Sequence, residues 1–323
     1  MKKSLKRLRL LALLAAAMCA CQEKEPVAGP DAGTDDDAAQ PADTVKTEPK
    51  VAIEDQPIPE YELYFEDEFD DMDAVGNNWW CYATENPSNS ELQRYSGDNL
   101  SFGEDPLHGR SCMILTARRD TCEDCSNNQY LKSAKVSTQY NKAACVTTYG
   151  RVEASIMLPK TYKGLWPAFW MMGTDIGTVG WPRCGEIDIM EFGHSGGFAS
   201  EEKAERYFNG ACHWGTSHQQ SSKFYEAPYS LQDGEFHQYT LIWTSQSIRC
   251  YLDMDSTDNP KPYFALDITG NSYFHKDFYL LLNLAVGGQY PGIYDPAGVT
   301  ALAPVGGEAS MYIDYVRIYR EKE

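Results

Sequence analysis

The chain has 323 residues, enough for one large folded domain, and 47 Asp and Glu residues against 28 Lys and Arg residues give it a net charge of −19. Nucleic-acid binding needs a basic surface, so this charge argues against a nucleic-acid partner. Aromatic residues make up 12% of the chain, which fits either a β core or sugar-stacking surfaces and cannot decide between them.

The first 21 residues are predicted to be a signal peptide that is removed from the mature protein. Basic residues precede an apolar run from Leu10 to Ala20, about half the length of a membrane span. The run ends at Cys19-Ala20-Cys21 and is followed by polar residues. A cysteine after a small residue resembles the lipidation box of bacterial lipoproteins, so we expect Cys21 to be lipidated, with a plain secretory peptide as the alternative.

Residues 22–60 are predicted to be a disordered, acidic linker. The segment is rich in Ala, Pro, Asp, Glu and Thr, includes the run Asp35-Asp36-Asp37, and has almost no large apolar residue. Behind a lipidated cysteine it would tether a domain to a membrane. The expected location is therefore that of an exported bacterial lipoprotein on the outer membrane, displayed in the periplasm or at the cell surface.

Eight cysteines follow Cys21, and export would allow them to form disulfides whose pairing the sequence does not give. Cys122 and Cys125 have the spacing of a zinc or redox motif. No second Cys pair or His pair completes such a site, so a loop disulfide or simple thiols are expected there.

Residues 61–323 show the pattern of an all-β domain. Val152, Ala154 and Ile156 alternate with other side chains, as on a half-buried strand. Phe278 to Val286 is a nearly continuous apolar run, which is typical of a strand buried on both faces. Short strands are separated by Gly, Pro, Asn and Asp turns, and no long helical periodicity occurs. The simplest architecture is an antiparallel β-sandwich.

The segment Gly185 to Gly193 carries three acids in the pattern Glu186-x-Asp188-x-x-Glu191. Glu186 and Asp188 are two residues apart and share one face of a strand. Glu191 has the wrong parity, unless a β-bulge near Ile189–Met190 adds one residue and returns it to that face. The sequence therefore predicts three acids on one surface of a bulged strand.

Three acids so arranged can perform glycoside hydrolysis. The two glutamates would lie about 13 Å apart at their Cα atoms, at ~3.3 Å per strand step, and side chains leaning together could approach the separation of a retaining glycosidase. Ionising all three neighbouring acids would place three negative charges side by side, which is unfavourable. One acid is therefore expected to stay protonated, as a general acid must. A solvated acidic face is one alternative interpretation. Calcium binding is another, but these acids lie on a strand without the glycine-bearing loop of an EF-hand.

The segment resembles the catalytic motif of glycoside hydrolase family 16, of the laminarinase and mixed-linkage glucanase type. Further stretches match that family in order over about residues 60–320: Glu66–Asp70, Glu91–Gln93, Tyr149–Ala154, Gly164–Trp170, His213–Gly215, Phe236–Tyr239, Asn283–Gly288 and Ile313–Arg317.

The resemblance implies a jelly-roll sandwich with an open substrate cleft on its concave face. It implies a retaining endo-glycosidase acting on β-1,3-glucan or mixed-linkage β-1,3/1,4-glucan, with Glu186 as nucleophile, Glu191 as acid/base and Asp188 steadying the nucleophile. We expect a monomer whose partners are the β-glucan and the membrane. The substrate-binding candidates are Trp166, Trp170, Trp181, His213, Trp214, Glu91 and Gln289.

No cofactor is needed for this chemistry, but the resemblance implies a structural calcium, with Glu68, Gly109 and Asp314 as candidate ligands. Gln289-Tyr290 replaces the common Asn-Trp pair, which leaves the linkage preference open. The alternatives are an agarase, porphyranase or carrageenase on the same fold, and a surface glycan-binding lipoprotein without catalysis. Sulfated substrates favour basic clefts, whereas this domain is acidic.

Overall fold

A computed structural model of the chain describes residues 51–70, 78–84, 87–120, 130–140 and 146–323. The predicted signal peptide, Cys21, most of the predicted linker, and Cys122, Cys125 and Cys145 lie outside these residues. Within them, the remaining cysteines are free thiols: Cys81, Cys112, Cys184, Cys212 and Cys250.

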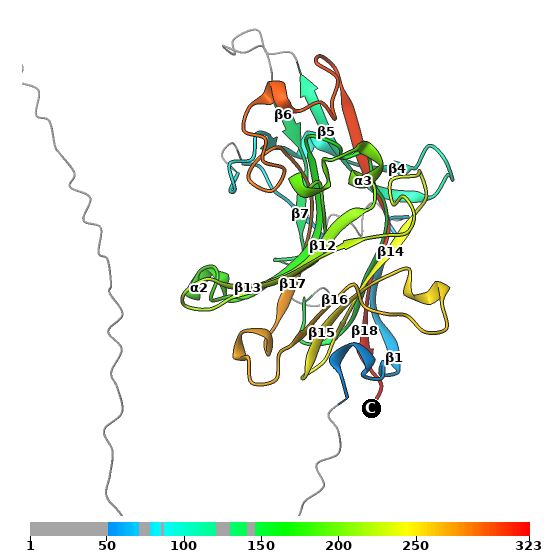
Figure 1. Cartoon of the computed structure of the whole chain (residues 1–323), viewed down its shortest axis with the longest axis vertical. Helices are drawn as coiled ribbons and strands as arrows, with labels where there is room; N and C mark the ends of the chain where they lie inside the picture. The colour runs from blue at the N-terminus through cyan, green and yellow to red at the C-terminus, as the bar shows by residue number, and fades with distance from the viewer. Residues whose placement is uncertain (1–50, 71–77, 85–86, 121–129, 141–145) are drawn as a thin grey trace, which may run out of the picture. The chain divides into compact units, whose positions relative to one another are not determined.

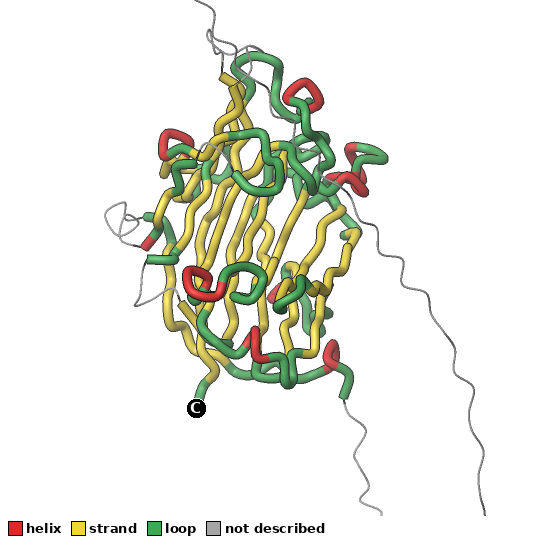
Figure 2. The backbone as a smooth tube through the Cα atoms, turned by 90° about the vertical axis from the view of Figure 1, so that its left-hand side faces the viewer, coloured by secondary structure: helices red, strands yellow, loops and turns green. Residues whose placement is uncertain are grey.

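The described residues form two β-sheets, which we call the site sheet and the back sheet (Figure 1). The site sheet has the order β13 (Gln219–Glu226), β12 (Tyr207–Trp214), β11 (Glu186–Phe192), β10 (Leu165–Gly173), β17 (Phe278–Val286), β7 (Lys135–Ser137), β2 (Trp80–Cys81), with β8 (Val146–Thr147) also paired to β17. Figure 2 shows strands running side by side with the loops gathered at their ends.

The back sheet has the order β16 (Phe264–Asp267), β15 (Ser247–Leu252), β14 (His237–Trp243), β9 (Gly150–Met157), β18 (Glu308–Glu321), β5 (Ser111–Asp120), β6 (Tyr130–Ser133), β3 (Arg94–Tyr95). β1 (Tyr61–Asp67) pairs with β18, and β4 (Leu100–Glu104) pairs with β5. The described strand pairs are antiparallel except for the short β3–β6 pair. The predicted antiparallel sandwich is confirmed.

The core lies between the two sheets and follows from the alternation of side chains. Phe169, Ile187 and Leu282 of the site sheet and Val152 and Ile313 of the back sheet are fully buried in one cluster. Each buried side chain of this size stabilises the fold by roughly 1.5–3 kcal/mol relative to exposure. Strand β17 is buried along its whole length, as its apolar run predicted.

Helices in the described residues are short and lie in the connections between strands. They are α2 (Ile176–Val179), α3 (Glu201–Ala204) and the 3₁₀ turns η1 (Ile53–Asp55), η2 (Gly97–Asn99), η3 (Ser195–Gly197), η4 (Met254–Ser256), η5 (Ser272–Phe274) and η6 (Pro296–Gly298). None of these described helices has the length and apolar character to cross a membrane.

The folded unit begins before the predicted boundary at Tyr61. The compact unit spans Lys50–Glu323. Arg249, which is 1% exposed, donates hydrogen bonds to the backbone oxygens of Gln56 (2.6 Å) and Pro57 (3.1 Å). The end of the predicted disordered linker is therefore part of the domain, because a buried guanidinium needs these carbonyls as partners.

Candidate active site

The acidic segment forms β11, and the predicted bulge is present in it. Asp188 pairs with Ala211 of β12 and Glu191 pairs with Asn209, so three steps on β11 oppose two on β12. The pairing with β10 shifts in the same region. Ile189 and Met190 are both buried in the core, and the hydroxyl of Tyr263 donates to the Ile189 carbonyl. The extra residue thus leaves all three acids on one face.

Two tryptophans from neighbouring segments orient the two glutamates. The Trp181 indole N–H donates to Glu186 Oε2 at 2.9 Å, and the Trp166 indole N–H donates to Glu191 Oε1 at 3.0 Å. Asn209 Nδ2 lies 3.3 Å from the second oxygen of Glu191 and donates to it. Each glutamate therefore has a fixed side-chain direction and a free flank toward the cleft.

The three acids resist ionisation because they are buried together. Burial raises the pKa of Glu186 to about 8, and the Asp188 carboxylate adds to this rise. Burial also raises the pKa of Asp188 well above its ordinary value and raises that of Glu191 despite the N–H donors that favour its charged form. In the described part of the chain their ion-pair partner is a histidine, His213, 3.3 Å from Asp188 Oδ2. The site thus retains a proton near neutral pH.

His213 is itself held by a second histidine. Its Nδ1 lies 2.8 Å from His218 Nε2, and the two rings are stacked with centroids 5.1 Å apart. His213 lies 4.0 Å from Glu186 as well as near Asp188. Glu186, Asp188 and His213 each offer one ligand atom within 4.8 Å of the others, so in the described residues these three side chains form a group that could hold a metal ion.

A cleft of about 620 Å³ lies in front of the acids. It extends from β11 across β10, β17 and β7 to the segment that follows β2. It is lined by Tyr82, Thr84, Pro87, Ser88, Asn89, Glu91, Tyr95, Lys135, Gln139, Trp166, Ala168, Trp170, Met172, Ile176, Trp181, Glu186, Asp188, Glu191, Tyr279, Leu281 and Asn283.

Four of the residues predicted to bind substrate line the cleft: Glu91, Trp166, Trp170 and Trp181. Tyr95 and Gln93 donate to Glu91 Oε2 at 2.8 and 2.7 Å. Trp170 donates to Asn283 Oδ1 at 2.8 Å.

Trp214 and Gln289 were also predicted to bind substrate, and neither is among the residues that line this cleft. Trp214 follows His213 on a strand, so it points to the opposite face and packs on the core against Phe274. Gln289 is exposed in the turn after β17, where its backbone N–H donates to Asn89. The residue that reaches the site from this turn is Tyr290, whose ring stacks on Trp166 with centroids 4.8 Å apart.

Lys135, Asn209 and Tyr290 are site residues that the sequence did not reveal. The Tyr290 hydroxyl donates to Asn209 Oδ1 and to the Glu191 carbonyl, the latter at 3.1 Å. The Lys135 ammonium lies 4.6 Å from the Trp170 ring centre and 5.1 Å from that of Tyr82. Burial lowers the pKa of Lys135, against the pull of Glu91 and Glu186. The double glycine before Tyr290 was the available signal, because it marks a tight turn at the end of a buried strand.

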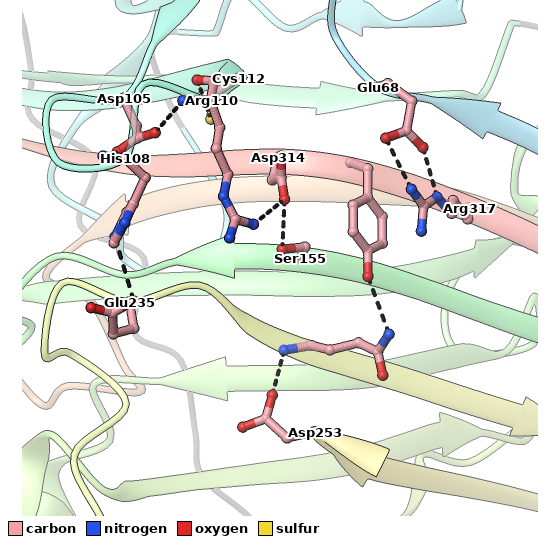
Figure 3. A network of polar contacts seen from close by, with 12 residues as sticks. Glu68, Asp105, His108, Arg110, Cys112, Ser155, Glu235, Asp253, Asp314 and Arg317 are labelled. Carbon is pink, nitrogen blue, oxygen red and sulfur yellow. Dashed lines mark hydrogen bonds and ion pairs between the residues drawn. The ribbon is translucent and has the colours of Figure 1, made fainter. Parts of the chain in front are cut away.

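The predicted calcium ligands are not assembled as a cation site. Glu68 binds Arg317 through both carboxylate oxygens, at 2.6 and 3.0 Å. Asp314 accepts from Arg110 at 2.7 Å and from Ser155 at 3.1 Å (Figure 3). The backbone N–H of Gly109 donates to the Asp105 carbonyl. Both carboxylates are paired with guanidinium groups in this structure, and the calcium site stays a prediction.

The site sheet of this β-sandwich carries two oriented glutamates on one bulged strand, beside an aromatic-lined cleft. This arrangement defines a glycoside hydrolase of the two-carboxylate class. The family model of glycosyl hydrolases family 16 matches residues 98–263. The chain belongs to this family.

Relatives of known structure or sequence agree with this assignment. The mixed-linkage glucan family 16 protein of Bacteroides ovatus, solved with a G4G4G3G product, is 38% identical, with a TM-score of 0.68 and coverage of 79% of this chain and 99% of that one. The β-glucanase of Rhodothermus marinus is 32% identical over 288 residues, covering 81% of this chain and 86% of that protein. The clotting factor G α subunit of Tachypleus tridentatus is 30% identical, but the match spans 34% of its length.

Proposed function

We propose that the chain is a retaining endo-β-glucanase that hydrolyses mixed-linkage β-1,3/1,4-glucan and β-1,3-glucan by double displacement. The observation that carries the proposal is the pair Glu186 and Glu191 on one face of β11, each held by an indole N–H and open to a cleft. The family's catalytic motif supplies the assignment of Glu186 as nucleophile.

In the first step the Glu186 carboxylate attacks the anomeric carbon, while Glu191 protonates the glycosidic oxygen of the departing half of the chain. A positive charge develops on the sugar and stabilises the ionised form of Glu186. Without substrate, burial and the Asp188 carboxylate disfavour that form. In the second step Glu191 takes a proton from water, which attacks the anomeric carbon from the face that the leaving sugar vacated and releases the Glu186 carboxylate. Two inversions restore the β configuration.

The charges of the cleft favour a neutral polysaccharide. Its lining carries four carboxylic acids, Glu91, Glu186, Asp188 and Glu191, and one cation, Lys135. A sulfated galactan would bring negative charge against these acids, which is electrostatically unfavourable. The similarity to a mixed-linkage glucan protein of Bacteroides ovatus adds support for a β-glucan. A purely binding role would gain nothing from three buried, mutually repelling acids.

Product analysis tests this function. The purified protein is incubated with barley β-glucan, laminarin, cellulose, agarose and carrageenan, and the anomer released first is followed by NMR. We expect β-anomeric oligosaccharides from barley β-glucan and laminarin and little from cellulose. Release from carrageenan or agarose alone, or initial release of the α-anomer, would contradict the proposal.

We further propose that the protein is exported and anchored to the outer membrane through a lipid on Cys21. The apolar run, the Cys19-Ala20-Cys21 sequence and the acidic segment behind it support this location. Cells would be labelled with a clickable fatty acid, and wild type compared with Cys21→Ala. Labelling is expected for wild type alone, and equal labelling of both would refute the anchor.

A further inference from the structure

The pairing of strands in the site sheet places one row of residues across the cleft face at the level of Glu191. From β13 to β7 the partners are Phe224, Asn209, Glu191, Ala168, Asn283 and Lys135. Residues directly opposite one another on neighbouring strands stand on the same face of a sheet. Because Glu191, Ala168, Asn283 and Lys135 line the cleft, Asn209 and Phe224 face the same side.

The two ends of this row differ. The cleft covers the half from Glu191 to Lys135. The half over β12 and β13 has a small floor residue, Ala211, which pairs with Ser222, and it ends at Phe224, whose side chain is 38% exposed. Two strand spacings separate the positions of Glu191 and Phe224, about 10 Å.

Phe224 is a fixed aromatic surface and not a loose side chain. Its ring stacks on Tyr207 with centroids 5.0 Å apart and an interplanar angle of 5°. The ring centroid of His194 lies 4.5 Å from that of Phe224 and 4.8 Å from that of Tyr290, and Tyr290 in turn stacks on Trp166. A continuous series of rings therefore leads from the tryptophan that holds Glu191 to an exposed ring on β13.

Double displacement assigns different tasks to the two halves. The donor half of the glucan must stay bound as the glycosyl–enzyme, which suits the cleft with its many lining residues. The acceptor half must leave before water can enter, which suits an open surface with few contacts. Resting on the proposed function, we propose that Phe224 is an acceptor-side subsite. A sugar of the departing half, beyond the one whose glycosidic oxygen Glu191 protonates, would stack its apolar face on this ring.

This placement has a clear kinetic signature. A mixed-linkage glucan polymer has sugars on both sides of the cleaved bond, whereas an aryl β-glycoside of a gluco-oligosaccharide has sugars on the donor side alone. Loss of an aromatic stacking surface removes on the order of 1 kcal/mol of binding. Phe224→Ala should lower kcat/KM on the polymer about five- to tenfold and change it by less than about twofold on the aryl substrate. Phe224→Trp should restore activity on the polymer.

Two further variants make the test specific. Lys135→Met alters the donor half, so it should lower kcat/KM on both substrates. Tyr64 on the back sheet has the same 38% exposure as Phe224, so Tyr64→Ala should affect neither. If wild type cleaves β-glucan but Phe224→Ala leaves the polymer unaffected, or lowers both substrates equally, the acceptor subsite is wrong. If wild type cleaves no β-glucan, the proposed function itself fails.

Discussion

Buried acids lie on both sheets of the sandwich, in opposite surroundings. On the back sheet Glu153 is 1% exposed and binds Arg151 at 2.5 Å, and the Tyr319 hydroxyl donates to it at 2.9 Å. On the site sheet Glu186 and Glu191 receive N–H groups from Trp and Asn side chains and lie beside a third acid. The charge of the back-sheet acid is neutralised by side chains of the fold, whereas the site-sheet acids remain available to act on a substrate.

This comparison shows why acid content alone did not locate the site. Burial alone would raise the pKa of Asp253 on the back-sheet side, but hydrogen bonds from His237 and from the Gln238 backbone lower it below its ordinary value. Burial with an acidic neighbour raises the pKa of Glu186 to about 8. An acid is thus structural where a cationic side chain is paired with it, and chemical where other acids are among its neighbours.

The largest expected effect is on catalysis. Glu186→Ala removes the atom that forms the glycosyl–enzyme bond, so kcat on β-glucan should fall by about 10⁴-fold or more. Added azide can occupy the vacated space and should give an α-glycosyl azide from an activated aryl glycoside. In Glu191→Ala, azide should instead attack the covalent intermediate and give the β-azide. The reverse pairing of products and variants would exchange the two roles.

The second effect is on stability, through an acid of the back sheet. Glu153→Gln removes the buried charge that partners Arg151, which then keeps an ion pair with the exposed Asp255. We expect the free energy of unfolding to fall by about 2–3 kcal/mol, measured by urea denaturation, with kcat nearly unchanged. A loss of activity in the folded variant would show that the two sheets are not independent in this respect.

The third effect concerns an acid of the site sheet, where the substitution should raise the free energy of unfolding instead of lowering it. The pKa of Glu186 is about 8 in the folded protein against an ordinary value of 4.5. Its contribution to stability is therefore fully present below about pH 4.5 and is lost as the pH rises through about 8. Glu186→Gln cannot ionise, so it should be more stable than wild type by about 1–2 kcal/mol at pH 8. Thermal unfolding at pH 4 and pH 8 would check this, and an equal effect at both would contradict it.

The smallest effect is that of a chelator. Because Arg317 and Arg110 bind Glu68 and Asp314, EDTA should shift the melting temperature by less than about 1 °C, and added calcium should not raise it. A calcium-dependent rise of several degrees would place a cation elsewhere in the chain.

Local patterns predicted the parts of the site that depend on one segment. The parity of Glu186, Asp188 and Glu191 required a bulge, and the structure has one. The same parity rule could have excluded Trp214, because two adjacent strand residues cannot both face the cleft.

The remaining site residues depend on which strands pair and in which register. Asn209 reaches Glu191 because β12 pairs with β11 across the bulge, and Lys135 joins the cleft because β7 pairs with β17. Neither relation is encoded within one short segment. The strand pattern supplied the sandwich, and the resemblance supplied the acid roles and the calcium prediction for Glu68 and Asp314. In the structure the carboxylates of these two residues bind Arg317 and Arg110.

The bulge in β11 also has a genetic consequence. Loss of the single codon for Met190 would turn the strand into one with regular alternation and leave Glu186, Asp188 and Glu191 on the same face, whereas loss of the Ile187 codon would separate Glu186 from the other two. An expressed deletion of Met190 should therefore retain measurable hydrolysis where a deletion of Ile187 does not. A descendant gene could pass between bulged and regular versions of this active site through one three-nucleotide indel, with the reacting groups never leaving the cleft.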